Sequence, residues 1–96
     1  MWETPSFDYS PEKNTYLKET RGISFEEVVL AIDEGRVLDI IETPNQQKHP
    51  RQKMYVVNIN GYVYLVPFVR DGDVAFLKTV FPSRKFTKLY LNKDIK

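Results

Sequence analysis

Residues 52–70 read QKMYVVNINGYVYLVPFVR, two runs rich in β-branched and aromatic residues on either side of Asn60-Gly61. An Asn-Gly pair favours the tight type I′ turn, because both of its positions need a positive φ angle. The sequence therefore predicts a β-hairpin of the two runs in which Ile59 pairs with Tyr62. Because side chains alternate along a strand, one face of this hairpin is mainly aromatic and the other mainly aliphatic.

Two helices are predicted before this hairpin. Ser10-Pro11 is a typical helix start and Gly22 a typical helix end, so the first helix covers the residues between them. Ser24 and Glu27 have the spacing of a capping box, which predicts a second helix that ends at Gly35. The two acidic residues at 33 and 34, in the last turn of this helix, oppose its dipole and indicate that a basic group lies nearby.

The remaining segments complete an α+β fold. A short extended piece is expected at 7–9, further strands at 36–43 and 74–81, and a short C-terminal helix at 84–91. The expected architecture has two N-terminal helices packed on one face of an antiparallel β meander of about four strands. A chain of 96 residues is long enough for one domain, so residues 1–96 are expected to form a single one.

Charge is distributed unevenly along the chain. Residues 1–45 carry ten acidic and four basic side chains, a net charge of −6, whereas residues 46–96 carry three acidic and ten basic ones, a net charge of +7. Such asymmetry indicates a polyanionic partner for the basic half. The alternative is that the acidic and basic halves complement each other within one fold.

Composition excludes several classes of site. The chain has no cysteine, which excludes a disulfide scaffold, a thiolate nucleophile and a cysteine-ligated metal. No apolar run is long enough for a signal peptide or a spanning helix, so a cytoplasmic protein without membrane contact is expected. No phosphate-binding glycine loop or metal motif occurs, and we expect no cofactor and no metal site.

The turn after the hairpin determines where two lysines point. A three-residue turn at 71–73 places Lys78 on the aromatic face together with Lys53, whereas a two-residue turn would place Lys78 on the aliphatic face, which is expected to be buried under the helices. We therefore predict the three-residue turn and an open aromatic, basic face. Cations beside aromatic rings suit single-stranded nucleic acid, because cations contact phosphates and rings stack on bases. The alternative is that the rings pack against a loop or the C-terminal helix.

The chain resembles the BrnT family of toxins. The resemblance lies in FDY at 7–9, PEKN at 11–14 and RGISFEEV at 21–28, and it continues in KTVFPSRKFT at 78–87 and in Tyr90. It covers most of residues 7–90. The resemblance implies a RelE-like fold, ribonuclease activity and neutralisation by a cognate antitoxin.

RNA can be cleaved without a metal ion when its own 2′-OH attacks the adjacent phosphorus, given a base, an acid and cations for the transition state. The expected catalytic residues are Lys53, Lys78 and Arg84, of which Arg84 has a planar fork suited to phosphate oxygens. His49 is the only histidine and a candidate for proton transfer or RNA contact; the alternative is an exposed loop histidine without a role. The expected RNA-binding residues are Tyr62, Tyr64, Lys85, Lys88 and His49, the two tyrosines being alternatively core residues.

The functional hypothesis is thus the toxin of a toxin–antitoxin system, a metal-independent endoribonuclease and hydrolase neutralised by its antitoxin. Contact with operator DNA through the antitoxin complex is a further hypothesis. The alternative to an enzyme is a small non-catalytic module that binds nucleic acid or protein with its basic, aromatic sheet face.

Overall fold

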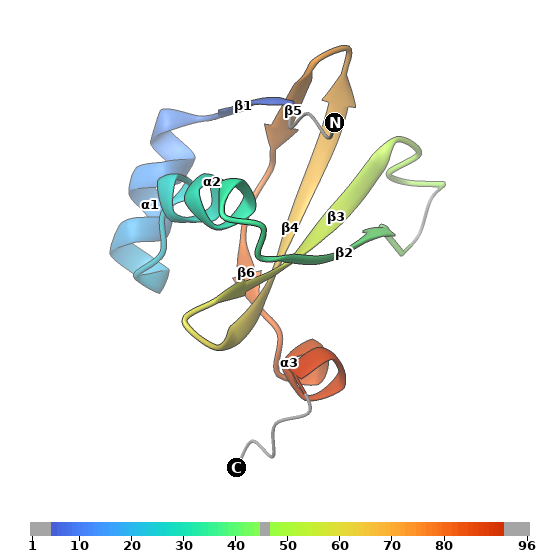
Figure 1. Ribbon diagram of the computed structural model, residues 1–96. Helices are drawn as coiled ribbons and strands as arrows, with labels where there is room; N and C mark the ends of the chain where they lie inside the picture. The colour runs from blue at the N-terminus through green and yellow to red at the C-terminus, as the bar shows by residue number, and fades with distance from the viewer. Residues whose placement is uncertain (1–4, 45–46, 92–96) are drawn as a thin grey trace.

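The computed structural model describes residues 5–44 and 47–91 and contains three helices and a mixed sheet of six strands (Figure 1). It confirms the α+β class. None of these helices is long and apolar enough to cross a membrane. The elements in chain order are β1 (Ser6–Tyr9), α1 (Pro11–Arg21), α2 (Phe25–Asp33), β2 (Val37–Glu42), β3 (Gln52–Ile59), β4 (Tyr62–Asp71), β5 (Val74–Leu77), β6 (Phe81–Pro82) and α3 (Arg84–Leu91).

The predicted helix ends are confirmed by their capping contacts. The Ser10 hydroxyl accepts a hydrogen bond from the Lys13 N–H at the start of α1. Gly22 ends this helix with a φ angle of 66°, in the left-handed region that glycine enters without steric cost. At the start of α2, the side chains of Ser24 and Glu27 each accept from the backbone N–H of the other, which completes the capping box.

The hairpin of β3 and β4 has the predicted register. Ile59 pairs with Tyr62, and the pairing continues outward to Gln52 opposite Val69. Asn60 has a φ angle of 56° and Gly61 one of 80°, as a type I′ turn requires.

The sheet is larger than the predicted meander and is not purely antiparallel. Its strand order is β1-β5-β4-β3-β2, with β6 also paired to β4. The short N-terminal strand β1 lies parallel to β5 and forms one edge, while β2 forms the other. The single strand predicted at 74–81 is interrupted, because β5 ends at Leu77 and the chain rejoins β4 only at Phe81.

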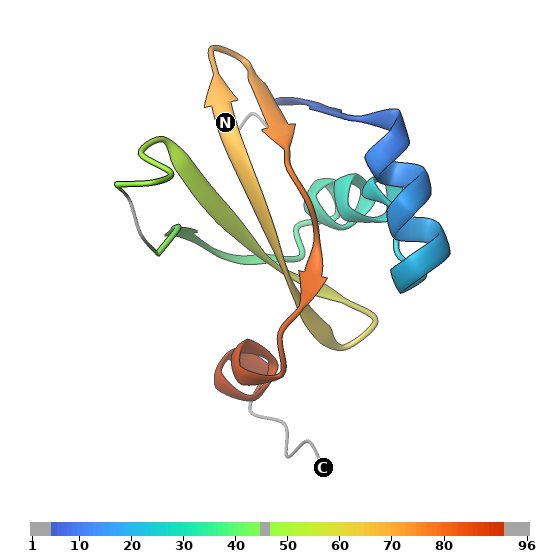
Figure 2. The ribbon, with the colours of Figure 1, turned by 180° about the vertical axis from the view of Figure 1, so that it is seen from behind.

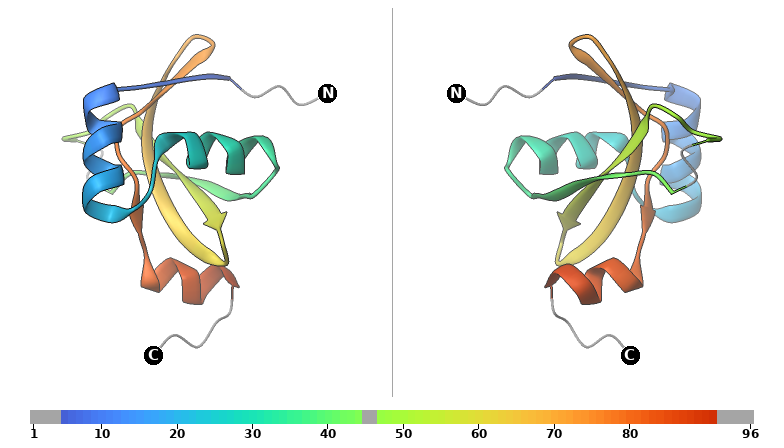
Figure 3. Two further views of the ribbon diagram at one scale, coloured as in Figure 1. Left: turned by 90° about the vertical axis from the view of Figure 1, so that its left-hand side faces the viewer. Right: turned by 90° about the vertical axis from the view of Figure 1, so that its right-hand side faces the viewer.

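The prediction of which face the two helices cover was wrong. Helices α1 and α2 lie together on the aromatic face, and α3 lies against the lower part of the other face (Figures 1 and 3). The larger core therefore includes Tyr55, Val57, Val66 and Phe68 of the hairpin. The smaller cluster under α3 contains the aliphatic residues Met54, Val56, Val63 and Leu65.

A physical reason for this arrangement lies in the sizes of the side chains. The rings of Tyr55 and Phe68 stack with their centroids 4.0 Å apart and are both about 5 % exposed. Aromatic rings remove more apolar surface from water than aliphatic side chains do. The aromatic face therefore gains more from a cover of two helices, which add the fully buried Leu17, Phe25 and Val28. The aliphatic patch is small enough for the eight-residue α3.

Candidate functional site

Lys53 and Lys78 lie on opposite faces of the sheet, contrary to the prediction. Lys53 pairs with Phe68, and Phe68 pairs with Leu77, so these three side chains share the face under α1 and α2. Lys78 follows Leu77 directly and points to the other face. The two lysines therefore cannot contact one phosphate group.

The register after β4 explains this difference. Asp71 pairs with Val74, which leaves a two-residue turn of Gly72 and Asp73 in place of the predicted three-residue turn. The two-residue turn was rejected because it was expected to bury Lys78. The face that carries Lys78 is, however, covered by α3 only near the β3–β4 turn, and Lys78 is exposed beyond that helix. The expected cost of burying an ammonium group does not arise.

Three basic side chains surround a shallow hollow on this uncovered part of the sheet, which we call the open face. The hollow has a volume of about 260 Å³ and is lined by His49, Pro50, Arg51, Gln52, Val69 and Lys78. The Lys78 ammonium lies over the Phe76 ring, 5.4 Å from its centroid, and that ring is 37 % exposed. An exposed ring beside several cations is suited to a ligand that is both anionic and aromatic.

Helix α3 carries Arg84, Lys85 and Lys88 on the same side of the sheet, and all three are exposed. Its N-terminus is fixed to β4, where the Ser83 N–H donates to the Val63 carbonyl at 2.9 Å. Val63 and Val69, which lines the hollow, are six positions apart on β4, a distance of about 20 Å. Arg84 therefore does not reach the hollow that contains Lys78, and the three predicted catalytic residues are not brought together.

The buried Thr87 fixes the middle of α3 to β4. Its hydroxyl donates to the Ser83 carbonyl at 2.7 Å and accepts from the Val63 N–H at 2.8 Å. The α3 rings of Phe86 and Tyr90 stack on each other and pack against the aliphatic cluster. Figure 2 shows α3 at the lower end of the sheet, and its three cations are exposed to solvent.

Tyr62 and Tyr64 lie on the opposite face from the hollow. Their rings meet edge to face with centroids 6.1 Å apart, and both side chains are partly buried. Tyr64 packs against the larger core, in agreement with the alternative that it is a structural residue.

Lys53 lines a second basic hollow, of about 210 Å³, on the helix-covered face. Its other lining residues are Ile40, Arg51, Tyr55, Phe68 and Arg70. Burial raises the pKa of Tyr55, and the nearby Arg70 charge acts in the opposite direction. Arg51 thus lines two hollows, one on each face of the sheet.

Arg51, Arg70 and Phe76 were not singled out from the sequence. Phe76 precedes Lys78 by two residues, a spacing that places both on one face of a strand and that could have identified the pair. Arg51 and Arg70 belong to a loop and a strand end that meet only in the folded hairpin. No local pattern in the sequence indicates their proximity.

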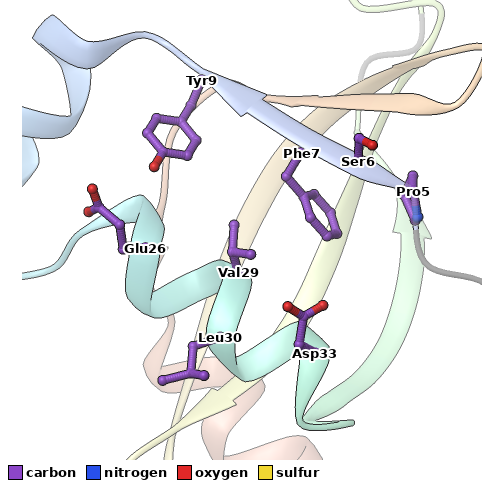
Figure 4. A pocket seen from close by; sticks show the side chains of 8 residues that line it. All are labelled: Pro5, Ser6, Phe7, Tyr9, Glu26, Val29, Leu30 and Asp33. Atoms are coloured by element: carbon purple, nitrogen blue, oxygen red, sulfur yellow. The ribbon is translucent and has the colours of Figure 1, made fainter.

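A third and larger hollow lies between β1 and α2, with a volume of about 610 Å³ (Figure 4). Its lining combines apolar side chains with polar ones, and the carboxylates of Glu26 and Asp33 stand at its two ends. Within the described ranges 5–44 and 47–91, no three His, Asp or Glu side chains gather as a metal site would require.

Comparison of the chain with protein-family models and with curated proteins finds no match. The functional argument therefore depends on the geometry of the sites.

Proposed function

We propose that the protein is the RNA-cleaving toxin of a toxin–antitoxin pair and that RNA binds on the open face. The observation that carries the proposal is the convergence of His49, Arg51 and Lys78 on one hollow beside the exposed Phe76 ring. Guanidinium and ammonium groups bind phosphate oxygens, and an exposed ring offers a base a surface for stacking. The resemblance to BrnT toxins and the helix-covered α+β sheet are compatible with this function.

The proposed reaction assigns roles to the residues of the hollow. The 2′-OH oxygen attacks the adjacent phosphorus, a 2′-O–P bond forms and the bond from phosphorus to the 5′-oxygen breaks. His49 takes the proton of the 2′-OH, since an imidazole exchanges protons near neutral pH more readily than other side chains. Lys78 and Arg51 stabilise the charge on the phosphorane oxygens. Water supplies the proton for the 5′-oxygen, and the imidazolium of His49 gives its proton to the resulting hydroxide, so that no water is consumed. The products are a 2′,3′-cyclic phosphate and a 5′-hydroxyl.

This assignment changes the predicted catalytic set. Lys78 keeps its proposed place at the phosphate, whereas Lys53 lies on the other face and Arg84 lies about 20 Å away along β4. Arg84, Lys85 and Lys88 then contact the RNA backbone beyond the scissile phosphate. A cognate antitoxin would inhibit the toxin by covering the open face.

The experiment compares a double variant of the proposed site with a variant of a lysine on the other face of the sheet. Wild type, a His49→Ala/Lys78→Ala double variant and Lys53→Ala are induced in cells, and growth and total RNA are recorded. We expect growth arrest and RNA fragments with 2′,3′-cyclic phosphate ends for wild type and Lys53→Ala, and neither for the double variant. Thermal melting of each purified protein shows whether the double variant remains folded. Equal cleavage by all three folded proteins would contradict the proposed site.

A non-catalytic RNA-binding module is the second candidate function. It is favoured by the wide separation of Lys78 and Arg84, because a binding surface needs spread cations whereas a catalytic centre needs convergent ones. The purified full chain distinguishes the two: stable binding of a single-stranded RNA without cleavage, in buffers with and without a divalent cation, would identify the binding module.

A further inference from the structure

The groove between β1 and α2 has several apolar side chains in a mixed lining and an acidic residue at each end. Phe7 and Tyr9 point from β1 toward α2, and Val29 points from α2 toward them (Figure 4). Leu30 also lines the groove, at its border, with its side chain turned away from β1. Leu30 is 57 % exposed and can therefore contact a partner.

The charge at one end of the groove is not balanced within the described chain. Asp33 and Glu34 both lie at the C-terminal end of α2, where the helix dipole disfavours negative charge. Glu34 forms an ion pair with Arg36 at 3.2 Å, which compensates the negative charge of Glu34. In residues 5–44 and 47–91, Asp33 has neither an ion pair nor a side-chain hydrogen bond, and its carboxylate stands beside the groove (Figure 4).

The other end of the groove is acidic as well. Glu26 accepts a hydrogen bond from the Asn14 amide at 2.9 Å and pairs loosely with Lys18 at 3.6 Å. Its side chain nevertheless remains 57 % exposed. Glu26 and Asp33 are seven residues apart on one helix, so two turns and about 10 Å separate them along its axis. Val29 and Leu30 lie between them on the same side.

We propose that this groove binds a basic amphipathic helix of a partner protein, with two Lys or Arg residues seven positions apart and apolar residues midway. The spacing favours a helix, because residues seven apart on a helix are also separated by about 10 Å along its axis, whereas same-face residues of an extended strand are separated by about 7 or 13 Å. The apolar residues pack on Leu30 and Phe7, and the two cations meet Glu26 and Asp33. The groove lies apart from the open face, so this inference does not depend on RNA cleavage.

The test uses an alanine-rich synthetic helix with two lysines seven positions apart and two leucines midway, and a matched peptide with glutamates in place of the lysines. The full chain, labelled with ¹⁵N, is titrated with each peptide. We expect shifts of the amide signals of Phe7, Val29, Leu30 and Asp33 with the lysine peptide only. Absence of these shifts, or equal binding of both peptides, overturns the proposal.

Charge reversal at the groove provides the matched comparison. Asp33→Lys is expected to weaken binding of the lysine peptide roughly tenfold, a change of about 1.4 kcal/mol. Glu19→Lys makes the same change of charge on exposed α1, outside the groove, and is expected to alter binding less than about twofold. Equal weakening by both variants would indicate a net-charge effect and overturn the proposal. Self-association of the free protein that Asp33→Lys abolishes would assign the groove to a second copy of the chain and also overturn it.

Discussion

Replacement of Thr87 by valine should loosen α3 from the sheet with little change in side-chain volume. In the wild type, the buried Thr87 hydroxyl is the acceptor for the Val63 N–H at 2.8 Å. Valine leaves this buried N–H without its acceptor, which costs about 1–3 kcal/mol. The Ser83 carbonyl also loses a hydrogen bond, but the energetic cost is smaller, because this carbonyl still accepts a hydrogen bond from the Thr87 N–H at 3.0 Å. Threonine and valine have similar helix propensities, so the loss of the hydrogen bond dominates.

Urea and thermal unfolding of the full chain measure this effect. We expect the free energy of unfolding to fall by about 1–3 kcal/mol, and Tm to fall by about 4–8 °C for each kcal/mol in a domain of this size. Thr20→Val is the control, because the exposed Thr20 hydroxyl donates only to the Tyr16 carbonyl within α1, and its loss should cost less than about 0.5 kcal/mol. If the free energy of unfolding of Thr87→Val lies within about 0.5 kcal/mol of the wild-type value, the reasoning is refuted.

Three further predictions concern RNA affinity and two side-chain pKa values. Lys78→Ala should reduce the slope of log affinity for single-stranded RNA against log salt by about 0.7, the loss of one phosphate contact, and an unchanged slope would place Lys78 outside the RNA site. Asn14→Ala should raise the pKa of Glu26, since the Asn14 hydrogen bond is the main cause that lowers it. This lowered pKa stabilises the wild type above the ordinary glutamate pKa, and the contribution is lost as pH falls through the folded value. Carboxyl-carbon NMR titration of both proteins should therefore separate the two Glu26 curves, and coincident curves would contradict the assignment. Asp39→Asn should lower the pKa of Tyr90, which the hydrogen bond to Asp39 mainly raises. The stabilisation from Tyr90 is present below its unfolded pKa and is lost as pH rises through its folded pKa. The free energy of unfolding of Asp39→Asn should therefore fall less than that of the wild type at alkaline pH.

The local elements could be predicted from the sequence because short-range contacts determine them. Ser24 and Glu27 satisfy backbone donors within one helical turn, and Asn60-Gly61 fixes the register of its own hairpin. The parallel pairing of β1 with β5 joins residues 6–9 to residues 74–77. No adjacent pattern encodes a pairing over such a separation, and the sequence showed only that residues 7–9 would be extended.

The faces of the hairpin were harder to predict because both are apolar. Alternation separates Tyr55 from Val56 but does not say which of the two faces the helices cover. The prediction relied on the cost of burying Lys78 to choose a turn length, and that cost depended on the wrong face being buried. One incorrect assignment of the covered face thus produced the incorrect register and the incorrect catalytic set. The basic character of the second half was recognised from composition. The distribution of its basic residues between the two faces of the sheet became visible only in the fold.

The uneven distribution of charge along the chain gives an uneven distribution of charge on the folded surface. The basic residues that line the two smaller hollows come from the β2–β3 loop, the adjoining ends of β3 and β4, and the residue after β5, and Arg51 lines both hollows. A polyanion that passes this end of the sheet can contact cations on both faces, because no helix residue lines either hollow. The acidic groove lies on α2 and β1 and includes none of these cations. Among the residues that the structure describes, the ion pairs Lys18–Glu26 and Arg36–Glu34 each join residues of the acidic half, whereas the hydrogen bond from Tyr90 to Asp39 joins the two halves.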